Sequence, residues 1–240
     1  MVRGALTPNS VVTLTALFRG KAILFDLDGV LVNSAECVER TWRNWAARHH
    51  LDAEKVIAYA HGRRTIETVQ IVAPELSADD ELVTLESGEA MTSDGVYEIK
   101  GARELLELLP SDRWAVVTSG VRAVAEFRIR YTRLPSPSVM ICAEEISRGK
   151  PDPEGYLTAA ARLGQPSADC IVIEDAPAGI EAAHNAGMRA IAIASTYPAH
   201  RLREADAIVE QLADLTIVYD GKQILINADT GRTQKLGMPT

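Results

Sequence analysis

The chain has 240 residues, of which 47% are hydrophobic and 24% are charged, and its formal net charge is −8. This composition is ordinary for a globular protein with a hydrophobic core, and the length suits one large domain or a core with a small second domain. No run of about 18 apolar residues occurs, which excludes a membrane-spanning helix and disfavours a membrane partner. The negative net charge disfavours a nucleic-acid partner, because nucleic-acid binding requires clustered Lys and Arg.

Short apolar runs alternate with helix-like stretches along most of the chain. The first run, residues 11–18, contains two threonines and lacks a signal-peptide cleavage pattern, so we expect an extra edge strand there. Six further runs are short, apolar and rich in Val or Ile, as is typical of parallel strands that are buried on both faces. These runs are residues 22–27, 114–118, 139–142, 170–173, 190–194 and 207–209.

Helices are predicted between these strands, at residues 102–109, 121–131, 153–163 and 177–186. Gly164 and Gly187 stand where a C-terminal glycine cap belongs, and Pro153 and Pro177 stand where a first-turn proline is tolerated. Strands that alternate with helices predict an α/β fold, a Rossmann-like doubly wound parallel sheet.

Residues 34–98 interrupt this alternation with several amphipathic helical stretches. Val38, Trp42, Trp45 and Ala46 recur at spacings that place them on one helix face. We therefore predict an inserted α-helical cap domain at residues 34–98. It would join a core made of residues 1–33 and 99–240 through linkers near residues 33–34 and 97–100.

The C-terminal part of the chain predicts a hairpin at about residues 216–227. Alternating apolar residues there flank Asp220-Gly221, which is a strong turn signal.

Three cysteines, Cys37, Cys142 and Cys170, are far apart and form no CxxC pair, which argues against a disulfide framework or a zinc site. We expect Cys142 and Cys170 to be buried thiols, and the sparse cysteines favour a cytoplasmic location for the protein. A monomer is the default expectation for its oligomeric state.

Two aspartates, Asp26 and Asp28, follow the apolar run that starts at Ala22 and lead into Gly29. Side chains at the carboxyl end of such a strand lie in the crevice where open α/β sheets bind ligands. A buried carboxylate is costly unless a cation or hydrogen bonds compensate its charge. Taken alone, this motif has a plainer but less favoured interpretation as a turn after a strand.

Three later motifs follow strands in the same way. Thr118-Ser119-Gly120 offers a hydroxyl and backbone amides to an anion, although it could simply cap a helix. Lys150 lies just before a predicted helix, where a surface lysine is the plainer interpretation. Glu174-Asp175 adds a second acidic pair, and two such pairs favour a hard divalent cation such as Mg²⁺ with oxygen ligands. Together the four motifs would converge on one crevice.

The four motifs in this order resemble those of the haloacid dehalogenase-like phosphohydrolases. The resemblance spans about residues 22–209 and includes a helical cap inserted after the first motif. Residues 61–65, 114–120 and 174–179 are similar to a narrower group of small sugar-phosphate and polyol-phosphate phosphatases, which includes hexitol phosphatases and glycerol-3-phosphatases. The cap run at residues 38–45 is similar to the hexitol and 2-deoxyglucose phosphate enzymes in particular.

The resemblance implies a Mg²⁺-dependent phosphatase that acts on small phosphate monoesters. By analogy, Asp26 is the nucleophile that forms an aspartyl-phosphate, and Asp28 is the general acid and then the general base. Mg²⁺ would be held by Asp26, the Asp28 carbonyl and Asp175, with Glu174 either a direct ligand or one shell out. The remaining phosphate oxygens would be bound by Thr118, Ser119 and Lys150.

Substrate selectivity is assigned to the cap by the same resemblance. His61, Arg63 and Arg64 lie in a polar loop between two helical stretches, and we expect them to face the active site. A solvated turn between helices is the competing interpretation. Trp42 is expected to pack rather than to bind.

Two other functions share these motifs. A β-phosphoglucomutase-like phosphomutase uses all four, and similarity of the cap to the phosphatases favours hydrolysis. A phospho-accepting receiver-like signalling domain also combines acidic residues, a Thr or Ser and a Lys with Mg²⁺. The aspartate that accepts the phosphoryl group in a receiver domain lies on a middle strand, however, whereas Asp26 lies near the start of this chain. A helical cap also has no use in a receiver.

Overall fold

The computed structural model describes residues 11–90 and 92–235, and a six-stranded parallel sheet lies at its centre. The order of its strands is β6-β5-β2-β7-β8-β9. Each predicted strand is present, with ends that shift by at most two residues. The bounds are β2 (Ala22–Phe25), β5 (Trp114–Val117), β6 (Met140–Ile141), β7 (Cys170–Glu174), β8 (Arg189–Ile193) and β9 (Ala207–Val209).

The strand order reverses at β2, as a doubly wound sheet requires. The chain first builds β5 and β6 on one side of β2, and then crosses to build β7, β8 and β9 on the other side. Such a switch point leaves a crevice outside the carboxyl ends of the strands, where α/β proteins bind their ligands. The predicted fold class is therefore confirmed, and the first acidic motif follows the switch-point strand.

Helices and a second sheet cover the two faces of the central sheet. Alternate residues along β2 point to opposite sides, so that Ile23 and Phe25 pack in one buried cluster and Ala22 and Leu24 in another. The first cluster includes residues of α5 (Ala102–Glu107) and α6 (Arg122–Thr132), and the second includes residues of α7 (Glu154–Arg162) and α8 (Pro177–Asn185). The positive φ angles of Gly164, 66°, and Gly187, 72°, agree with the predicted C-terminal caps of α7 and α8.

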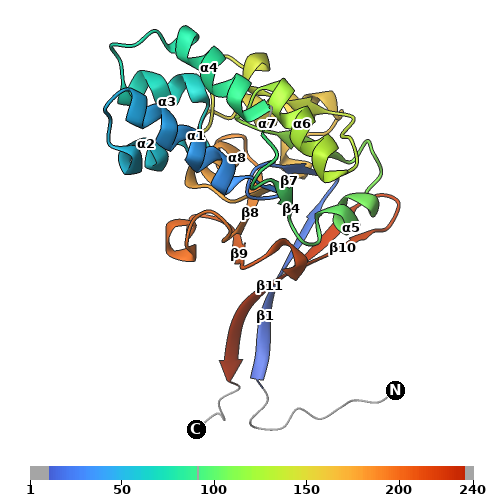
Figure 1. Ribbon diagram of the computed structural model, residues 1–240. Coiled ribbons are helices and arrows are strands. Elements are labelled where there is room, and N and C mark those ends of the chain that lie inside the picture. Colours follow the sequence, from blue (N-terminus) through green and yellow to red (C-terminus); the bar gives the residue numbers. More distant parts are fainter. Residues whose placement is uncertain (1–10, 91, 236–240) are drawn as a thin grey trace, which may run out of the picture.

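Four helices occupy the stretch between the first two central strands: α1 (Ala35–Arg48), α2 (Ala53–Ala60), α3 (Thr65–Val72) and α4 (Ala78–Ala90). They lie together beyond one end of the sheet (Figure 1). Trp42, Trp45 and Ala46 are buried in a hydrophobic cluster of their own, and Val38 packs against it. The helix face read from the sequence is thus the face that packs.

The two expected linkers run side by side. β3 (Val32–Asn33) and β4 (Tyr97–Glu98) pair antiparallel, with Val32 opposite Glu98 and Asn33 opposite Tyr97. The chain therefore enters and leaves the four helices through one short two-stranded ribbon. Such a junction leaves the helical segment few covalent and backbone ties to the sheet.

A second, antiparallel sheet has the order β1-β11-β10. β10 (Leu215–Tyr219) and β11 (Ile224–Lys235) form the predicted hairpin, in which Asp220 Oδ1 accepts from the amides of Lys222 at 2.9 Å and Gln223 at 2.8 Å. The predicted N-terminal edge strand is β1 (Val11–Gly20), but it belongs to this sheet because it pairs with β11. β1 and β11 extend away from the central sheet (Figure 1).

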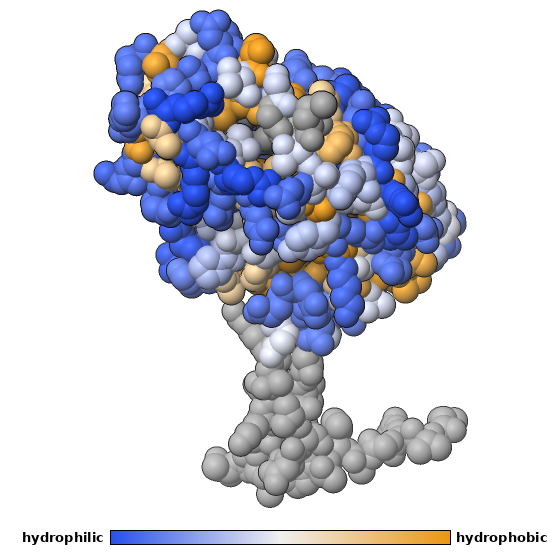
Figure 2. Space-filling view, in the orientation of Figure 1, coloured by the Kyte–Doolittle hydropathy of each residue, from blue (hydrophilic) through white to orange (hydrophobic). Residues whose placement is uncertain are grey.

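Hydrophilic residues predominate on the face drawn in Figure 2. In the part of the chain that the structure describes, no helix has the length and apolar character needed to cross a bilayer. Cys142 and Cys170 are buried thiols, as predicted, and Cys37 is buried as well.

Candidate active site

Three neighbouring strands of the central sheet end in polar side chains at the same edge. β2 leads into Asp26, β5 leads into Thr118, and β7 ends at Glu174, which Asp175 follows. β2 lies between the other two strands and is parallel to both. Because the carboxyl ends of parallel strands meet at one edge, three of the four sequence motifs come together there.

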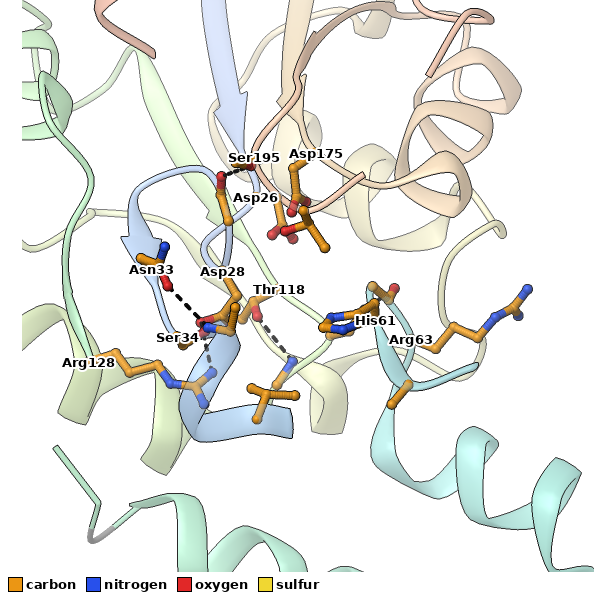
Figure 3. Close-up of a pocket in the computed structure, with 18 of the residues that line it drawn as sticks. Asp26, Asp28, Asn33, Ser34, His61, Arg63, Thr118, Arg128, Asp175 and Ser195 are labelled. Atoms are coloured by element: carbon orange, nitrogen blue, oxygen red, sulfur yellow. Dashed lines mark hydrogen bonds and ion pairs between the residues drawn. The ribbon is translucent and has the colours of Figure 1, made fainter. Parts of the chain in front are cut away.

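A cavity of about 110 Å³ lies at this edge. Asp26, Asp28 and Asp175 line it from the sheet, whereas Trp42 and His61 line it from the helical segment. Figure 3 shows the three aspartates on one side and the ring of His61 pointing into the space between them and the helices. The cavity is therefore enclosed by residues from both parts of the chain.

Lys150 is buried directly behind Asp26, with 5% of its surface exposed. Its Nζ donates to Asp26 Oδ1, to Glu174 Oε1 at 2.6 Å and to the carbonyl of Val117 at 3.3 Å. The three donors of the ammonium group thus each have an acceptor. In the structure Lys150 is the counter-ion of two carboxylates and does not line the cavity.

Glu174 is fully buried and has both carboxylate oxygens occupied. Oε1 accepts from Lys150 and, at 3.0 Å, from the Tyr156 hydroxyl. Oε2 accepts from the backbone amides of Asp175 at 2.8 Å and Ala176 at 2.9 Å. Of the two roles expected for Glu174, these contacts favour the one outside the direct ligands of the metal: Glu174 orients Lys150 and the loop that carries Asp175, and the cavity lining does not include it.

Negative charge exceeds positive charge around Asp26. Burial raises the pKa of Asp26 to about 7; Lys150 opposes this rise, while Glu174 and Asp28 add to it. Burial likewise raises the pKa of Asp175 well above its ordinary value, and Glu174 and Asp26 contribute. Burial lowers the pKa of Lys150, but Asp26 and Glu174 outweigh it and hold that pKa well above the usual range. A cation beside Asp26 and Asp175 would relieve this imbalance.

Gly29 brings the first and fourth motifs into contact. Its φ angle is +83°, and a Cβ at this position would lie 1.9 Å from Asp175 Oδ2. No other amino acid fits in that space, because it would need both a left-handed backbone and a displaced Asp175. The Ser195 hydroxyl donates to the Gly29 carbonyl at 2.6 Å and fixes the same turn.

Asp28 is held from two directions. Its Oδ1 accepts from the Ser34 hydroxyl at 2.7 Å and from Arg128 Nη1 at 2.8 Å, and both contacts are drawn in Figure 3. Ser34 is the residue before α1, and Arg128 lies on α6. Asp28 thus sits between the core and the first helix of the inserted segment.

The Thr118-Ser119-Gly120 motif is ordered by its own hydrogen bonds. Thr118 Oγ1 accepts from the Gly120 amide at 3.0 Å, while the Ser119 hydroxyl donates to the carbonyl of Gly62 at 3.0 Å. Gly62 lies in the loop between α2 and α3, so Ser119 also ties that loop to the sheet. All three motif residues line the cavity.

The three loop residues expected to face the site point in different directions. His61 faces the cavity, and its burial lowers its pKa, although Glu39 opposes this. Arg63 lines the cavity, but its guanidinium extends away from the aspartates (Figure 3). Arg64 does not line the cavity: it donates to the carbonyls of Ile146 at 3.0 Å and Ser147 at 2.9 Å.

Arg64 therefore differs from the expectation, because its charge is used at a contact between the helical segment and the core. It also pairs with Glu67 at 2.6 Å, and Glu67 Oε1 accepts from the Gly149 amide at 2.9 Å. This amide immediately precedes Lys150. The Arg64–Glu67 pair thus fixes the helical segment to the loop that positions Lys150.

Residues 21–187 match the model of the haloacid dehalogenase-like hydrolases. This stretch covers more than half of the chain and contains all four motifs. The chain belongs to that family. The family identified from the motifs is thereby confirmed.

Similar proteins are found among characterised enzymes and solved structures. The chain is 41% identical to hexitol phosphatase A of Escherichia coli over 204 residues, which cover 83% of this chain and 94% of that protein. It is 36% identical to glycerol-1-phosphate phosphohydrolase 1 of Saccharomyces cerevisiae, over 79% of this chain and 81% of that protein. A hydrolase structure from Pseudomonas syringae superposes with a TM-score of 0.72 at 25% identity, over 81% of this chain and 95% of that chain.

Phosphatases of the haloacid dehalogenase-like family generally use Mg²⁺, and the donors at this site suit such an ion. Among the side chains that the structure describes, no three His, Cys, Asp or Glu gather as a metal cluster. Asp26 and Asp175 nevertheless crowd together with raised pKa values, and the donors nearby are oxygen atoms. A hard cation held by two carboxylates, a carbonyl and substrate or water oxygens is compatible with this arrangement.

Several residues of the site were not predicted from the sequence. Arg128, Ser34 and Thr196 line the cavity, and Thr196 forms a hydrogen bond with Asp175. Arg128 carried a detectable signal, because it stands on the same helix face as the buried Val124 and Ala125. A charge on an apolar face requires a partner, and the search for that partner leads to Asp28.

Proposed function

We propose that this hydrolase is a Mg²⁺-dependent phosphatase of small sugar or polyol phosphate monoesters and that it works through an aspartyl-phosphate. The observation that carries the proposal is the placement of Asp26 and Asp28 at one small cavity, with Lys150 bound to Asp26. The hexitol and glycerol phosphate enzymes to which the chain is similar support the choice of substrate class.

The first half-reaction transfers the phosphoryl group to the protein. The Asp26 carboxylate attacks phosphorus, the bond from phosphorus to the ester oxygen breaks, and Asp28 gives its proton to the leaving alkoxide, so an alcohol departs. Lys150 keeps the Asp26 carboxylate oriented and partly neutralised. Thr118 and Ser119 line the cavity and are the proposed partners of the phosphate oxygens. Lys150 would join them by exchanging one of its present acceptors for a phosphate oxygen.

The second half-reaction regenerates the enzyme. Asp28 takes a proton from a water molecule whose oxygen attacks the aspartyl-phosphate, and the bond between phosphorus and Asp26 breaks to release inorganic phosphate. Mg²⁺, when held by Asp26, the Asp28 carbonyl and Asp175, supplies charge stabilisation for the transferring phosphoryl group. Glu174 takes part in this proposal by holding Lys150, not as a ligand.

Residues 34–98 are the proposed cap, and they would set the size of the substrate. The cavity of about 110 Å³ is small beside the roughly 300–1,000 Å³ of pockets for drug-sized ligands. His61 is the proposed contact for substrate hydroxyls, and Arg63 contributes from the rim. Arg64 is proposed to hold the cap closed. Opening of the β3–β4 junction would admit substrate and release product.

A phosphate-release screen tests the function. Purified protein is incubated with glycerol, hexitol and hexose phosphates, with Mg²⁺ or with EDTA, and inorganic phosphate is measured. We expect release from several esters, its loss in EDTA and its loss in Asp26→Asn. Asp112→Asn is the matched control, since Asp112 has 71% of its side chain exposed and is remote from the cavity lining.

The same assay separates the alternatives. Conversion of β-glucose 1-phosphate to glucose 6-phosphate without phosphate release would identify a phosphomutase. A stable phosphoprotein without turnover would identify a receiver-like signalling domain. Undiminished activity in EDTA would reject the proposed metal site.

A further inference from the structure

Arg128 is a buried cation that contacts the proposed acid and base of the reaction. It lies on the inner face of α6 and is 2% exposed. Its Nη1 donates to Asp28 Oδ1 at 2.8 Å, and it lines the same cavity as Asp28. α6 packs on the central sheet and follows the Thr118-Ser119-Gly120 motif almost immediately, so its position is fixed relative to Asp26.

The two oxygens of Asp28 have different surroundings. Oδ1 accepts both from Arg128 and from the Ser34 hydroxyl at 2.7 Å. Oδ2 has no hydrogen-bond partner within the described residues, and the side chain remains 27% exposed at the cavity. One oxygen is therefore committed to holding the side chain in place, while the other is open to a ligand.

We propose that Arg128 is a positioning residue that commits Oδ2 of Asp28 to the proton transfers. This inference rests on the proposed phosphatase function. Oδ1 already accepts two hydrogen bonds, and one of them comes from a cation that can only donate, so a proton is less favourable on Oδ1 than on Oδ2. The proton of neutral Asp28 therefore lies on Oδ2. It passes to the ester oxygen as the phosphorus–oxygen bond breaks, and a water proton returns to Oδ2 in the second half-reaction.

The quality of the leaving group distinguishes this role from substrate binding. An alkoxide is about as strong a base as hydroxide, and it needs a proton to leave. Acetate, the leaving group of acetyl phosphate, is the base of a carboxylic acid with a pKa of about 4 and needs none. kcat/KM includes only the steps up to departure of the leaving group, so it isolates the acid role of Asp28.

The experiment compares kcat/KM for glycerol 3-phosphate and acetyl phosphate in Arg128→Met, with Arg130→Met as the matched control. Arg130 lies on the same helix but is exposed and does not line the cavity. We expect Arg128→Met to lose roughly 10- to 100-fold on the glycerol ester and far less on acetyl phosphate. Arg128→Lys should recover part of the loss, since an ammonium also donates to Oδ1. Arg130→Met should leave both esters unchanged.

A double variant sharpens the test. Asp28→Asn combined with Arg128→Met should lose no more activity on the glycerol ester than Asp28→Asn alone, because both changes act through one group. An equal loss on the two esters, or additive losses in the double variant, would overturn the inference and leave the phosphatase proposal standing. A wild-type protein that hydrolyses neither ester would overturn both. If Arg128→Met does not fold, Ser34→Ala removes the other donor to Oδ1 and should show the same selectivity.

Discussion

Substitution of Lys150 by Met should destabilise the protein strongly, since it leaves two buried carboxylates without their shared counter-ion. Lys150 is 5% exposed and bonds to both Asp26 and Glu174. Removal of one partner of a buried pair costs about 3–5 kcal/mol. For a chain of this size each kcal/mol lowers Tm by about 2–4 °C, so we expect a fall of roughly 6–20 °C.

Lys21→Met is the matched control for this substitution. Lys21 also pairs with an aspartate, Asp169, at 2.8 Å, but the two side chains are 47% and 38% exposed. Exposed pairs of this kind contribute about 0–1 kcal/mol because water screens them. The expected fall in Tm is therefore at most about 4 °C.

The assay is thermal unfolding followed by circular dichroism, in EDTA so that bound metal does not replace the lost charge. Adding Glu174→Gln to Lys150→Met should restore part of the stability, because it removes one of the two unpaired charges. Similar falls in Tm for the Lys150 and Lys21 variants would refute the reasoning. Such a result would mean that, when no phosphate is bound, Lys150 does not neutralise the charge of the two buried carboxylates.

Three further predictions concern the metal, the first turn and the cap contact. In EDTA, Tm should fall as pH rises from about 4 to 7. The pKa of Asp26 is raised from 3.8 to about 7, so the folded state binds more protons than the unfolded state over that interval. Mg²⁺ should offset this fall, and a Tm that rises with pH over the interval would contradict the prediction. Gly29→Ala should lower stability by several kcal/mol, whereas Gly221→Ala, with a φ of +92° and no atom near the added Cβ, should cost only about 1–2 kcal/mol, as urea unfolding would measure. Arg64→Met should speed amide hydrogen exchange in α3 by roughly 10- to 100-fold, since two charge-assisted hydrogen bonds to the core are lost; unchanged exchange would show that this contact does not hold the segment.

The motifs of the site could be located from the sequence because each is tied to a local pattern. Asp26, Thr118 and Asp175 follow apolar runs, and parallel strands deliver the residues after them to one edge of the sheet. The same local logic predicted the helical segment after the first strand, the one-sided face with Trp42 and Trp45, and the C-terminal hairpin with its Asp220 turn. The predicted strands differ from the observed ones only at their ends, where polar residues can either join the hydrogen bonds of the sheet or lie outside them.

Pairing between distant side chains required the tertiary structure. Nothing in the local sequence distinguishes Arg63 from Arg64, yet Arg63 reaches the rim of the cavity and Arg64 reaches a loop of the core. The sequence also left open whether Glu174 binds a metal directly or lies one shell out, and its oxygens are taken by Lys150, Tyr156 and two amides. β1 looked like an edge strand, but only its register with β11 shows which sheet it joins.

The division has a physical basis. Periodicity along the chain fixes which residues are buried and where each strand ends, because it depends on neighbours a few positions away. The partner of a buried charge depends on the packing of the whole domain: Lys150 meets Asp26 across 124 positions, and Arg128 meets Asp28 across 100. Sequence therefore determined the chemistry available at the edge of the sheet, and packing decided which carboxylate oxygens accept hydrogen bonds from distant parts of the chain.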